Sequence, residues 1–149
     1  MVNELLQTNQ LGVWAAGDVA SYPDLIFGKR HRLDHWDNAV EQGKLAARNM
    51  TGAGETFLHV PHFFSDVFDL SYEFWGDTEE HDQAIYRSDV TTSSFSAWWL
   101  KEGRLQAAFV LNRPDEEREL APQWIKGRQS IEASMLRDSK SPLRQLKAA

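Results

Sequence analysis

The chain has 149 residues, a length that suits one domain or one domain with a fragment of another. Hydrophobic residues make up 42% and charged residues 26%, and this apolar content excludes a disordered chain. The net charge of −6 argues against a protein that binds nucleic acid or anionic membranes, and it favours a basic partner surface.

Two absences narrow the class of protein further. Cysteine is missing, so the chain has no disulfide, thiolate metal site or redox-active cysteine pair, and any redox chemistry would belong to a cofactor. Residues 1–7 resemble no signal peptide, and no apolar run approaches the roughly 20 residues that span a bilayer. The default expectation is a soluble cytoplasmic protein.

The first predicted element is a strand in the apolar run 12–20. The run shows no alternation of apolar and polar residues, which is typical of a strand covered on both faces in a parallel sheet. It leads into Gly17-Asp18, and ligands of open α/β sheets lie beyond the carboxyl ends of strands. A glycine there lets a ligand approach the backbone, although most Gly-Asp pairs are simple turns. The pair alone does not decide between a turn and a cofactor site.

A helix is predicted next, from about Ala39 to Met50, with Asp37 or Asn38 as its N-cap and Thr51-Gly52 beyond its end. Small residues recur on it at helical spacing and predict close packing on a sheet or another helix. The residues of this stripe are Ala39, Gly43, Ala46, Ala47 and Met50.

The segment 34–38 (DHWDN) would cluster at the start of this helix. Unpaired backbone N–H groups favour an electron-rich ligand there. Asp34, His35 and Trp36 could therefore line a flat heterocycle. The alternative is that Trp36 fills a domain junction while Asp37 or Asn38 only caps the helix.

Four histidines are candidate metal ligands by their spacing. His31 and His35 are four residues apart, and His59 and His62 form a second close pair. A proline inside the second pair and a predicted loop around the first leave no ligand geometry to argue from. No metal site is predicted, and hydrogen-bonded or surface histidines are favoured.

Residues 52–56 predict a hinge, with a domain boundary near residue 56. An aromatic and acidic cluster follows at 63–69 and is interpreted as a segment entering a core. Four antiparallel strands are then predicted, the last two joined as a hairpin through 101–104. These strands are expected at 70–75, 84–87, 95–100 and 105–112.

Helices are predicted to end the chain. Pro114 and the acidic residues 115–117 favour a helix that closes at Lys126-Gly127, with Pro122 as a kink or a break. A short helix is expected from Ser130 to about residue 137, followed by an extended tail at 141–146 whose leucines dock on the body.

Several catalytic motifs are missing from the sequence. There is no Ser-His-Asp order that suggests nucleophilic catalysis, no GxxxxGK[ST] and no GxGxxG. No catalytic residue is predicted on these grounds.

Three segments together resemble the C-terminal part of FAD-dependent pyridine-nucleotide oxidoreductases of the ferredoxin-reductase and apoptosis-inducing-factor type. Thr8 and the run 12–20 (GVWAAGDVA) are similar to the second FAD motif of that family. In that motif the Asp at the strand end binds the flavin ribityl chain. The resemblance therefore implies that Asp18, with Gly17, binds the cofactor.

The other two segments imply further flavin contacts. The stretch 32–39 (RLDHWDNA) is similar to a Glu-Ser-Trp or Glu-His-His segment of the family, which places Asp34, His35 and Trp36 beside the isoalloxazine ring. Asp34 stands where the family usually has Glu, a longer side chain. The stretch 61–66 (PHFFSD) resembles the family's Pro-x-Phe-Trp-Ser-Asp segment, in which an aromatic pair approaches the flavin. This implies that Phe63 and Phe64 do so here, and Phe64 replaces a Trp and lacks its indole N–H.

The resemblance covers nearly the whole chain and implies an α+β fold. We expect an antiparallel sheet of about four strands with C-terminal helices, the family's C-terminal or dimerisation domain, in residues 57–149. Residues 1–56 would be one strand and one helix at the C-terminal end of an α/β FAD-binding domain.

The resemblance also implies a function. The chain would be the C-terminal portion of a flavoprotein oxidoreductase that transfers electrons from NAD(P)H through FAD to a small redox carrier such as a ferredoxin or rubredoxin. Both GxGxxG fingerprints are absent, so the isolated chain, as a fragment or a split subunit, is expected to be inactive. Its expected partners are the missing N-terminal FAD- and NAD(P)H-binding portion or a second copy, and an iron–sulfur carrier.

The alternative hypothesis is a dimerisation or assembly module without bound flavin. The predicted strand at 12–18 has no sheet to join, and an apolar strand with an unpaired edge needs a cover. Strand exchange between two copies would provide one.

Overall fold

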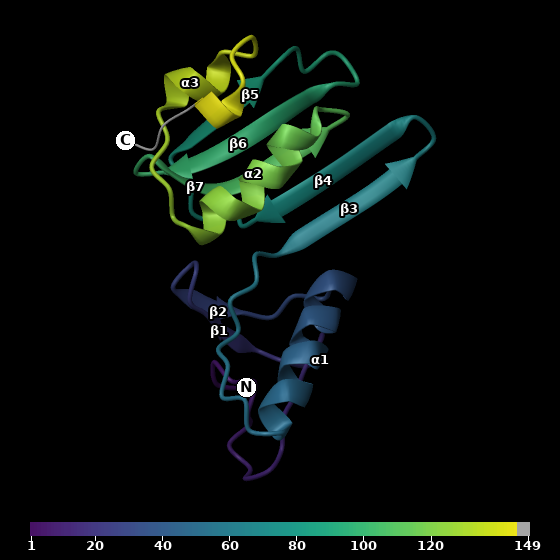
Figure 1. Ribbon diagram of the computed structural model, residues 1–149, viewed down its shortest axis with the longest axis vertical. Helices are drawn as coiled ribbons and strands as arrows, with labels where there is room; N and C mark the ends of the chain where they lie inside the picture. Colours follow the sequence, from purple (N-terminus) through teal and green to yellow (C-terminus); the bar gives the residue numbers. More distant parts are fainter. Residues whose placement is uncertain (146–149) are drawn as a thin grey trace. The chain divides into compact units, whose positions relative to one another are not determined.

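The computed structural model describes residues 1–145, and the chain divides into two compact units, residues 1–61 and residues 62 onward. The described part of the chain contains no helix with the length and apolar character that crossing a membrane requires. Figure 1 labels the helices and strands of the two units.

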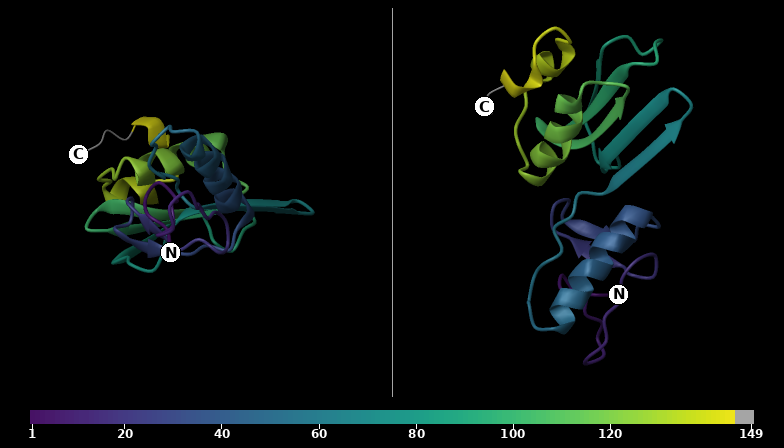
Figure 2. Two further views of the ribbon diagram at one scale, coloured as in Figure 1. Left: turned by 90° about the horizontal axis from the view of Figure 1, so that it is seen from below. Right: turned by 45° about the vertical axis from the view of Figure 1, so that its right-hand side comes forward.

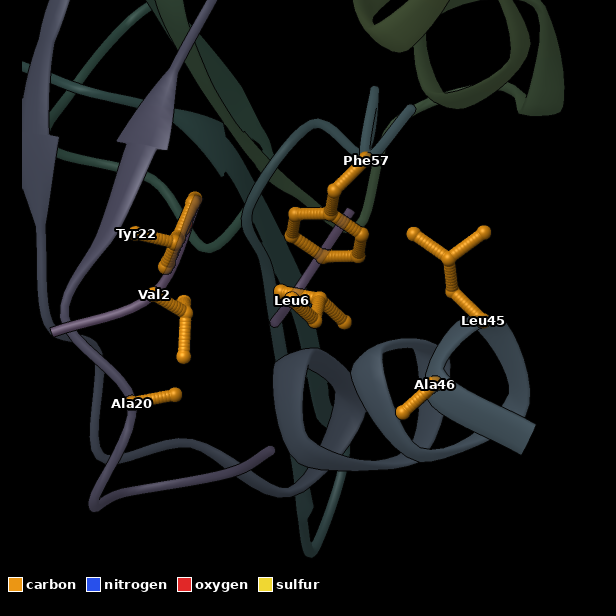
Figure 3. Packing of buried hydrophobic residues seen from close by; sticks show 7 residues of the cluster. All are labelled: Val2, Leu6, Ala20, Tyr22, Leu45, Ala46 and Phe57. Carbon is orange, nitrogen blue, oxygen red and sulfur yellow. The ribbon is translucent and has the colours of Figure 1, made fainter. Parts of the chain in front are cut away.

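The first unit contains a small hairpin and one long helix. Strand β1 (Tyr22–Asp24) pairs with β2 (Lys29–His31) in antiparallel fashion, and helix α1 spans Trp36–Met50. Side chains from the N-terminal segment, the hairpin, α1 and the segment after α1 meet in one core (Figure 3). The core residues are Val2, Leu6, Ala20, Tyr22, Leu45, Ala46 and Phe57.

The predicted strand at 12–18 is absent, and this prediction was wrong. Trp14 makes only an isolated antiparallel bridge to Gln7, and Gly17 and Asp18 lie in a turn. An apolar run becomes a strand only where a neighbour accepts and donates its backbone hydrogen bonds along the whole length. In the described first unit, the run shares two such bonds with the N-terminal segment. Thr8 N–H donates to the Val13 carbonyl at 2.9 Å, and Ala15 N–H donates to the Leu6 carbonyl at 3.1 Å. Two bonds around one bridge are too few for a strand along the whole run.

The predicted helix in this unit is confirmed, but its start and its inner face differ. It begins at Trp36, three residues earlier, after His35, which makes no side-chain cap hydrogen bond. The predicted capping by Asp37 or Asn38 was therefore wrong. The small-residue stripe was also wrong, because Gly43, Ala47 and Met50 are exposed. The buried residues of α1 are Asn38, Gln42, Leu45, Ala46 and Asn49.

The second unit is a five-stranded antiparallel sheet in the order β3-β4-β7-β6-β5. Its strands are β3 (His62–Val67), β4 (Leu70–Gly76), β5 (Gln83–Arg87), β6 (Phe95–Lys101) and β7 (Arg104–Leu111). The cluster at 63–69 was interpreted as a segment entering a core, and no strand was predicted at 62–67. Segment 62–67 forms an edge strand because β4 pairs with all six of its residues.

The helices of the second unit lie on one face of this sheet, as Figures 1 and 2 show. They are α2 (Asp115–Lys126), which contacts β4 and β7, α3 (Ala133–Arg137), which contacts β5, and the 3₁₀ turn η1 (Leu143–Gln145). The α2 prediction is confirmed, and α2 continues through Pro122 without a break.

The C-terminal region differs from the sequence-based expectation in two places. Helix α3 starts at Ala133 because Ser130 is held in a bridge to Arg104. The segment predicted as an extended tail contains η1, whose Leu143 is fully buried, while Leu146 lies outside the described residues.

A buried ion network joins the sheet to these C-terminal elements. Arg87 on β5 and Glu117 on α2 are 3% and 2% exposed, and Arg87 Nε donates to Glu117 Oε1 at 3.1 Å. Arg113 adds two donors to the same oxygen, at 3.0 and 2.8 Å. The Arg87 guanidinium also donates to the carbonyls of Leu136 and Ser141, at 3.2 and 2.6 Å. One side chain therefore links β5, α2 and the chain after α3.

We expect Glu117→Ala to lower the free energy of unfolding of the chain by about 3–5 kcal/mol, because it leaves the Arg87 guanidinium buried without its counter-charge. Glu119→Ala is the matched control on the same helix. Its carboxylate pairs with Arg144 at an exposed position, so its loss should cost at most about 1 kcal/mol. Urea unfolding followed by tryptophan fluorescence measures both, and equal effects would contradict the role given to the network.

Candidate functional site

The Gly17-Asp18 turn is fastened to helix α1. Gly17 has φ +78°, a conformation that favours glycine, and its N–H donates to Gln42 Oε1 at 2.8 Å. A Cβ added at Gly17 would lie 3.4 Å from the Cβ of Ala39. Gly17 is buried, whereas Asp18 beside it is exposed. The turn thus packs on the first turns of α1 and leaves an exposed carboxylate next to them.

The segment 34–36 leads into the same end of α1. His35 has an extended backbone with φ −145° and ψ 138°, and Trp36 is the first helical residue, with 68% of its surface exposed. Asp34 is exposed, and its Oδ2 lies 4.0 Å from Nη2 of Arg32. Because Gly17 is bonded to Gln42 and its Cα faces Ala39, one turn after Trp36, the fold brings two of the three predicted site segments together within the first unit.

Asp37 has a different role from the capping predicted for it. Its Oδ2 lies 2.6 Å from Nε2 of His59, which comes from the segment after the helix. Asn38, the other predicted cap, donates from Nδ2 to the Leu33 carbonyl at 3.3 Å. Both side chains therefore tie flanking chain segments to the start of α1.

Phe63 and Phe64 lie in the second unit on strand β3, and their side chains are on opposite faces of the sheet because strand residues alternate. Phe63 packs edge to face against Phe74, with ring centroids 5.9 Å apart. Phe64 is 52% exposed, and its ring lies 5.6 Å from that of His62. The rings of Phe63 and Phe64 therefore lie on different faces of the sheet.

Phe63 belongs to a continuous row of aromatic rings on the sheet face opposite the helices, which the sequence analysis did not identify. The strand register places Phe63, Phe74 and Phe109 directly beside one another. Ring contacts extend the row to Trp99 and to Phe95, at 6.0 and 5.7 Å. The alternation of aromatic residues in the strands carried this signal, but only the register shows that the rings are neighbours.

Three histidines, His31, His59 and His62, each pair with a single carboxylate. His31 lies 2.9 Å from Asp24 in a buried pair, and His62 lies 2.9 Å from Glu73 while stacking on the Trp75 ring at 5.0 Å. Among residues 1–145, no group of three or more His, Cys, Asp or Glu side chains is arranged to hold a metal ion.

Charged groups on the outer side of α1 are paired with each other. Lys44 Nζ donates to Glu41 Oε1 at 2.6 Å, and this hydrogen bond lowers the pKa of the Glu41 carboxyl below its usual value. Arg48 Nε donates to Glu55 Oε2 at 2.9 Å. The charges on these two acidic side chains are thus balanced by cations at neutral pH.

The second unit matches a known family. Residues 62–147 match the family model described as "Reductase C-terminal". This match confirms the resemblance that the sequence motifs indicated.

Individual relatives agree with that match. The chain is 34% identical over 120 residues to monodehydroascorbate reductase 4, peroxisomal, of Arabidopsis thaliana, covering 79% of this chain and 24% of the relative. It is 29% identical over 149 residues to putidaredoxin reductase of Pseudomonas putida, covering 100% of this chain and 35% of the relative. The chain therefore spans about a quarter to a third of the length of these curated relatives.

The fold also matches a solved structure. A covalent putidaredoxin reductase–putidaredoxin complex superposes on 97% of this chain and 34% of the solved chain, with a TM-score of 0.89 and 28% sequence identity.

We expect Trp36→Ala to change the free energy of unfolding by no more than about 0.5 kcal/mol, because the exposed ring contributes little to the core. The matched change Phe57→Ala, in the buried core of the same unit, should cost about 3–5 kcal/mol. Urea unfolding of both variants tests the assignment. A large loss for Trp36→Ala would mean that its ring is structural.

Proposed function

Because this chain belongs to the reductase C-terminal family, we propose that it is the C-terminal portion of a flavoprotein oxidoreductase that passes electrons from NAD(P)H through FAD to a small carrier such as a ferredoxin or rubredoxin. The observation that carries the proposal is the Gly17-Asp18 turn bound to α1 beside residues 34–36. It joins, in one unit, two segments that resemble flavin-binding segments of the family.

The residues of this site fit a flavin nucleotide. The exposed Asp18 carboxylate can accept hydrogen bonds from ligand hydroxyls, and the buried Gly17 before it ties the turn to α1. The exposed Trp36 ring offers an aromatic face, and Asp34 and His35 add polar groups at the same helix end. Asp18, Asp34 and Trp36 are exposed at the surface of the unit.

In this proposal the chain binds and orients, and the cofactor supplies the redox chemistry. FAD, when bound, accepts a hydride and passes electrons on. Asp18 would hold the cofactor through its hydroxyl groups, and Asp34, His35 and Trp36 would border its ring system. Phe64 is the more exposed ring of the aromatic pair, so it is better available to a ligand than Phe63, which packs on Phe74. No residue of the chain is assigned to proton transfer.

The proposal also divides the chain by role. Residues 1–56 would complete an FAD-binding domain, and residues 57–149 would form the reductase C-terminal domain. A dinucleotide fingerprint is absent from the sequence, so the pyrophosphate and NAD(P)H sites would belong to an N-terminal portion. The carrier protein is proposed from similarity to the reductase solved in complex with putidaredoxin.

Reconstitution tests this function. The purified chain would be mixed with FAD and a separately expressed N-terminal FAD- and NAD(P)H-binding portion of a ferredoxin reductase, and flavin retention after gel filtration would be measured. We expect the pair to retain FAD and to reduce a ferredoxin with NAD(P)H, whereas the chain alone should be inactive. A pair that forms but retains no flavin would refute the proposal and would favour the assembly-module alternative.

Asp18→Ala should weaken FAD binding by the reconstituted pair at least about tenfold, because hydrogen bonds to a charged group contribute roughly 1.5–3 kcal/mol. Glu4→Ala removes an exposed carboxylate elsewhere in the same unit and should leave the affinity unchanged. Titration of flavin fluorescence measures both dissociation constants. If Asp18→Ala and the unaltered chain bind FAD with equal affinity, Asp18 does not contribute to FAD binding.

A further inference from the structure

Helix α1 turns polar amide side chains inward, where apolar ones are usual. Asn38, Gln42 and Asn49 are all buried, and each bonds to the backbone of a segment outside the helix. Burying an amide side chain costs free energy unless the amide is hydrogen-bonded. These three amides meet that condition by bonding to backbone groups of the neighbouring loops. Each amide fastens a different stretch of chain to the helix.

Gln42 fastens the Gly17-Asp18 turn. Its side chain is 0% exposed, and its Oε1 accepts the Gly17 N–H at 2.8 Å. Its Nε2 is buried without a hydrogen-bond partner among the described residues. An apolar residue of similar size would avoid that unmet donor, so the bond to Gly17 is the contribution that a glutamine makes at this position.

The bond controls where Asp18 lies. The N–H of Gly17 is the last backbone donor before Asp18, and the positive φ of Gly17 sets the direction in which the chain leaves the turn. Ala39 packs beside the same glycine, since a Cβ added at Gly17 would lie 3.4 Å from the Ala39 Cβ. With both contacts in place, the exposed Asp18 is held at a defined position relative to the start of α1.

We propose that Gln42 is a positioning residue for flavin binding, which holds the Gly17 peptide so that the Asp18 carboxylate meets the cofactor. The inference rests on the proposed function, since it takes the Gly17-Asp18 turn as a flavin-binding element. Gln42 itself is buried and acts through Gly17, without touching the cofactor.

Three variants at position 42 separate this role from simple stability. Gln42→Leu removes the acceptor, Gln42→Asn shortens the side chain and withdraws the acceptor from Gly17, and Gln42→Glu keeps an oxygen at Oε1. The dissociation constant for FAD would be measured with the chain reconstituted with its N-terminal portion. We expect the Leu and Asn variants to raise it about fivefold to tenfold, as loss of one fixed hydrogen bond predicts, and the Glu variant to change it less than about threefold.

Asn49→Leu is the matched control. Asn49 lies two turns further along the inner face of α1, where its Nδ2 donates to the carbonyls of Leu5 and Glu55 at 3.0 and 2.8 Å. It should destabilise the unit at least as much as Gln42→Leu in urea unfolding, yet leave the dissociation constant for FAD unchanged while the protein is folded.

The outcomes distinguish two kinds of failure. If the unaltered reconstituted protein retains no FAD, the proposed function fails and this inference falls with it. If the unaltered protein binds FAD and both the Leu and Asn variants bind it equally tightly, only the role of Gln42 is overturned. The same holds if Asn49→Leu weakens FAD binding as much as Gln42→Leu does, because the effect would then follow stability.

Discussion

The fold of the first unit depends on finding hydrogen-bond partners for the backbone N–H and C=O groups of a chain that is mostly loop. Its two strands contain three residues each, so a sheet can pair few of its N–H and C=O groups. The buried amides of α1 take over part of this task, with Asn49 bonding to the backbone at Leu5 and Glu55 and Gln42 bonding to Gly17. Because buried backbone groups must find partners, the helix serves as the template on which these loops are ordered. The position of the Gly17-Asp18 turn is a consequence of that template.

In the second unit, the backbone hydrogen-bonding groups find their partners within a sheet. Five antiparallel strands pair their own backbone groups, and the helices need only cover one face. The buried charge of Arg87 is balanced by Glu117 and is used to hold carbonyl groups of the chain after α3. A buried ion network in which both signs of charge are paired favours one arrangement of the C-terminal segment over others. The opposite face carries the row of aromatic rings that includes Phe63.

The candidate site combines a buried support with exposed polar and aromatic groups. Gly17 and the inner side of α1 are buried, whereas Asp18, Asp34 and Trp36 are exposed around them. Binding groups held by packed neighbours lose little conformational entropy when a ligand arrives, which favours affinity. In the proposed function, the cofactor would supply the redox chemistry and these groups would only bind it.

The sequence by itself determined the helices, most of the strands and the identity of the proposed flavin-contacting residues. Hydrophobic periodicity, helix-terminal residues and short motifs are local properties, and they predicted α1, α2 and strands β4 to β7. Tertiary structure alone decided that residues 12–18 form no strand, that 62–67 form an edge strand, and that Asp37 pairs with His59 instead of capping. It also decided that Gln42 turns inward to Gly17. These outcomes depend on which distant segment supplies the hydrogen-bond partner, and a local pattern contains no information about that partner.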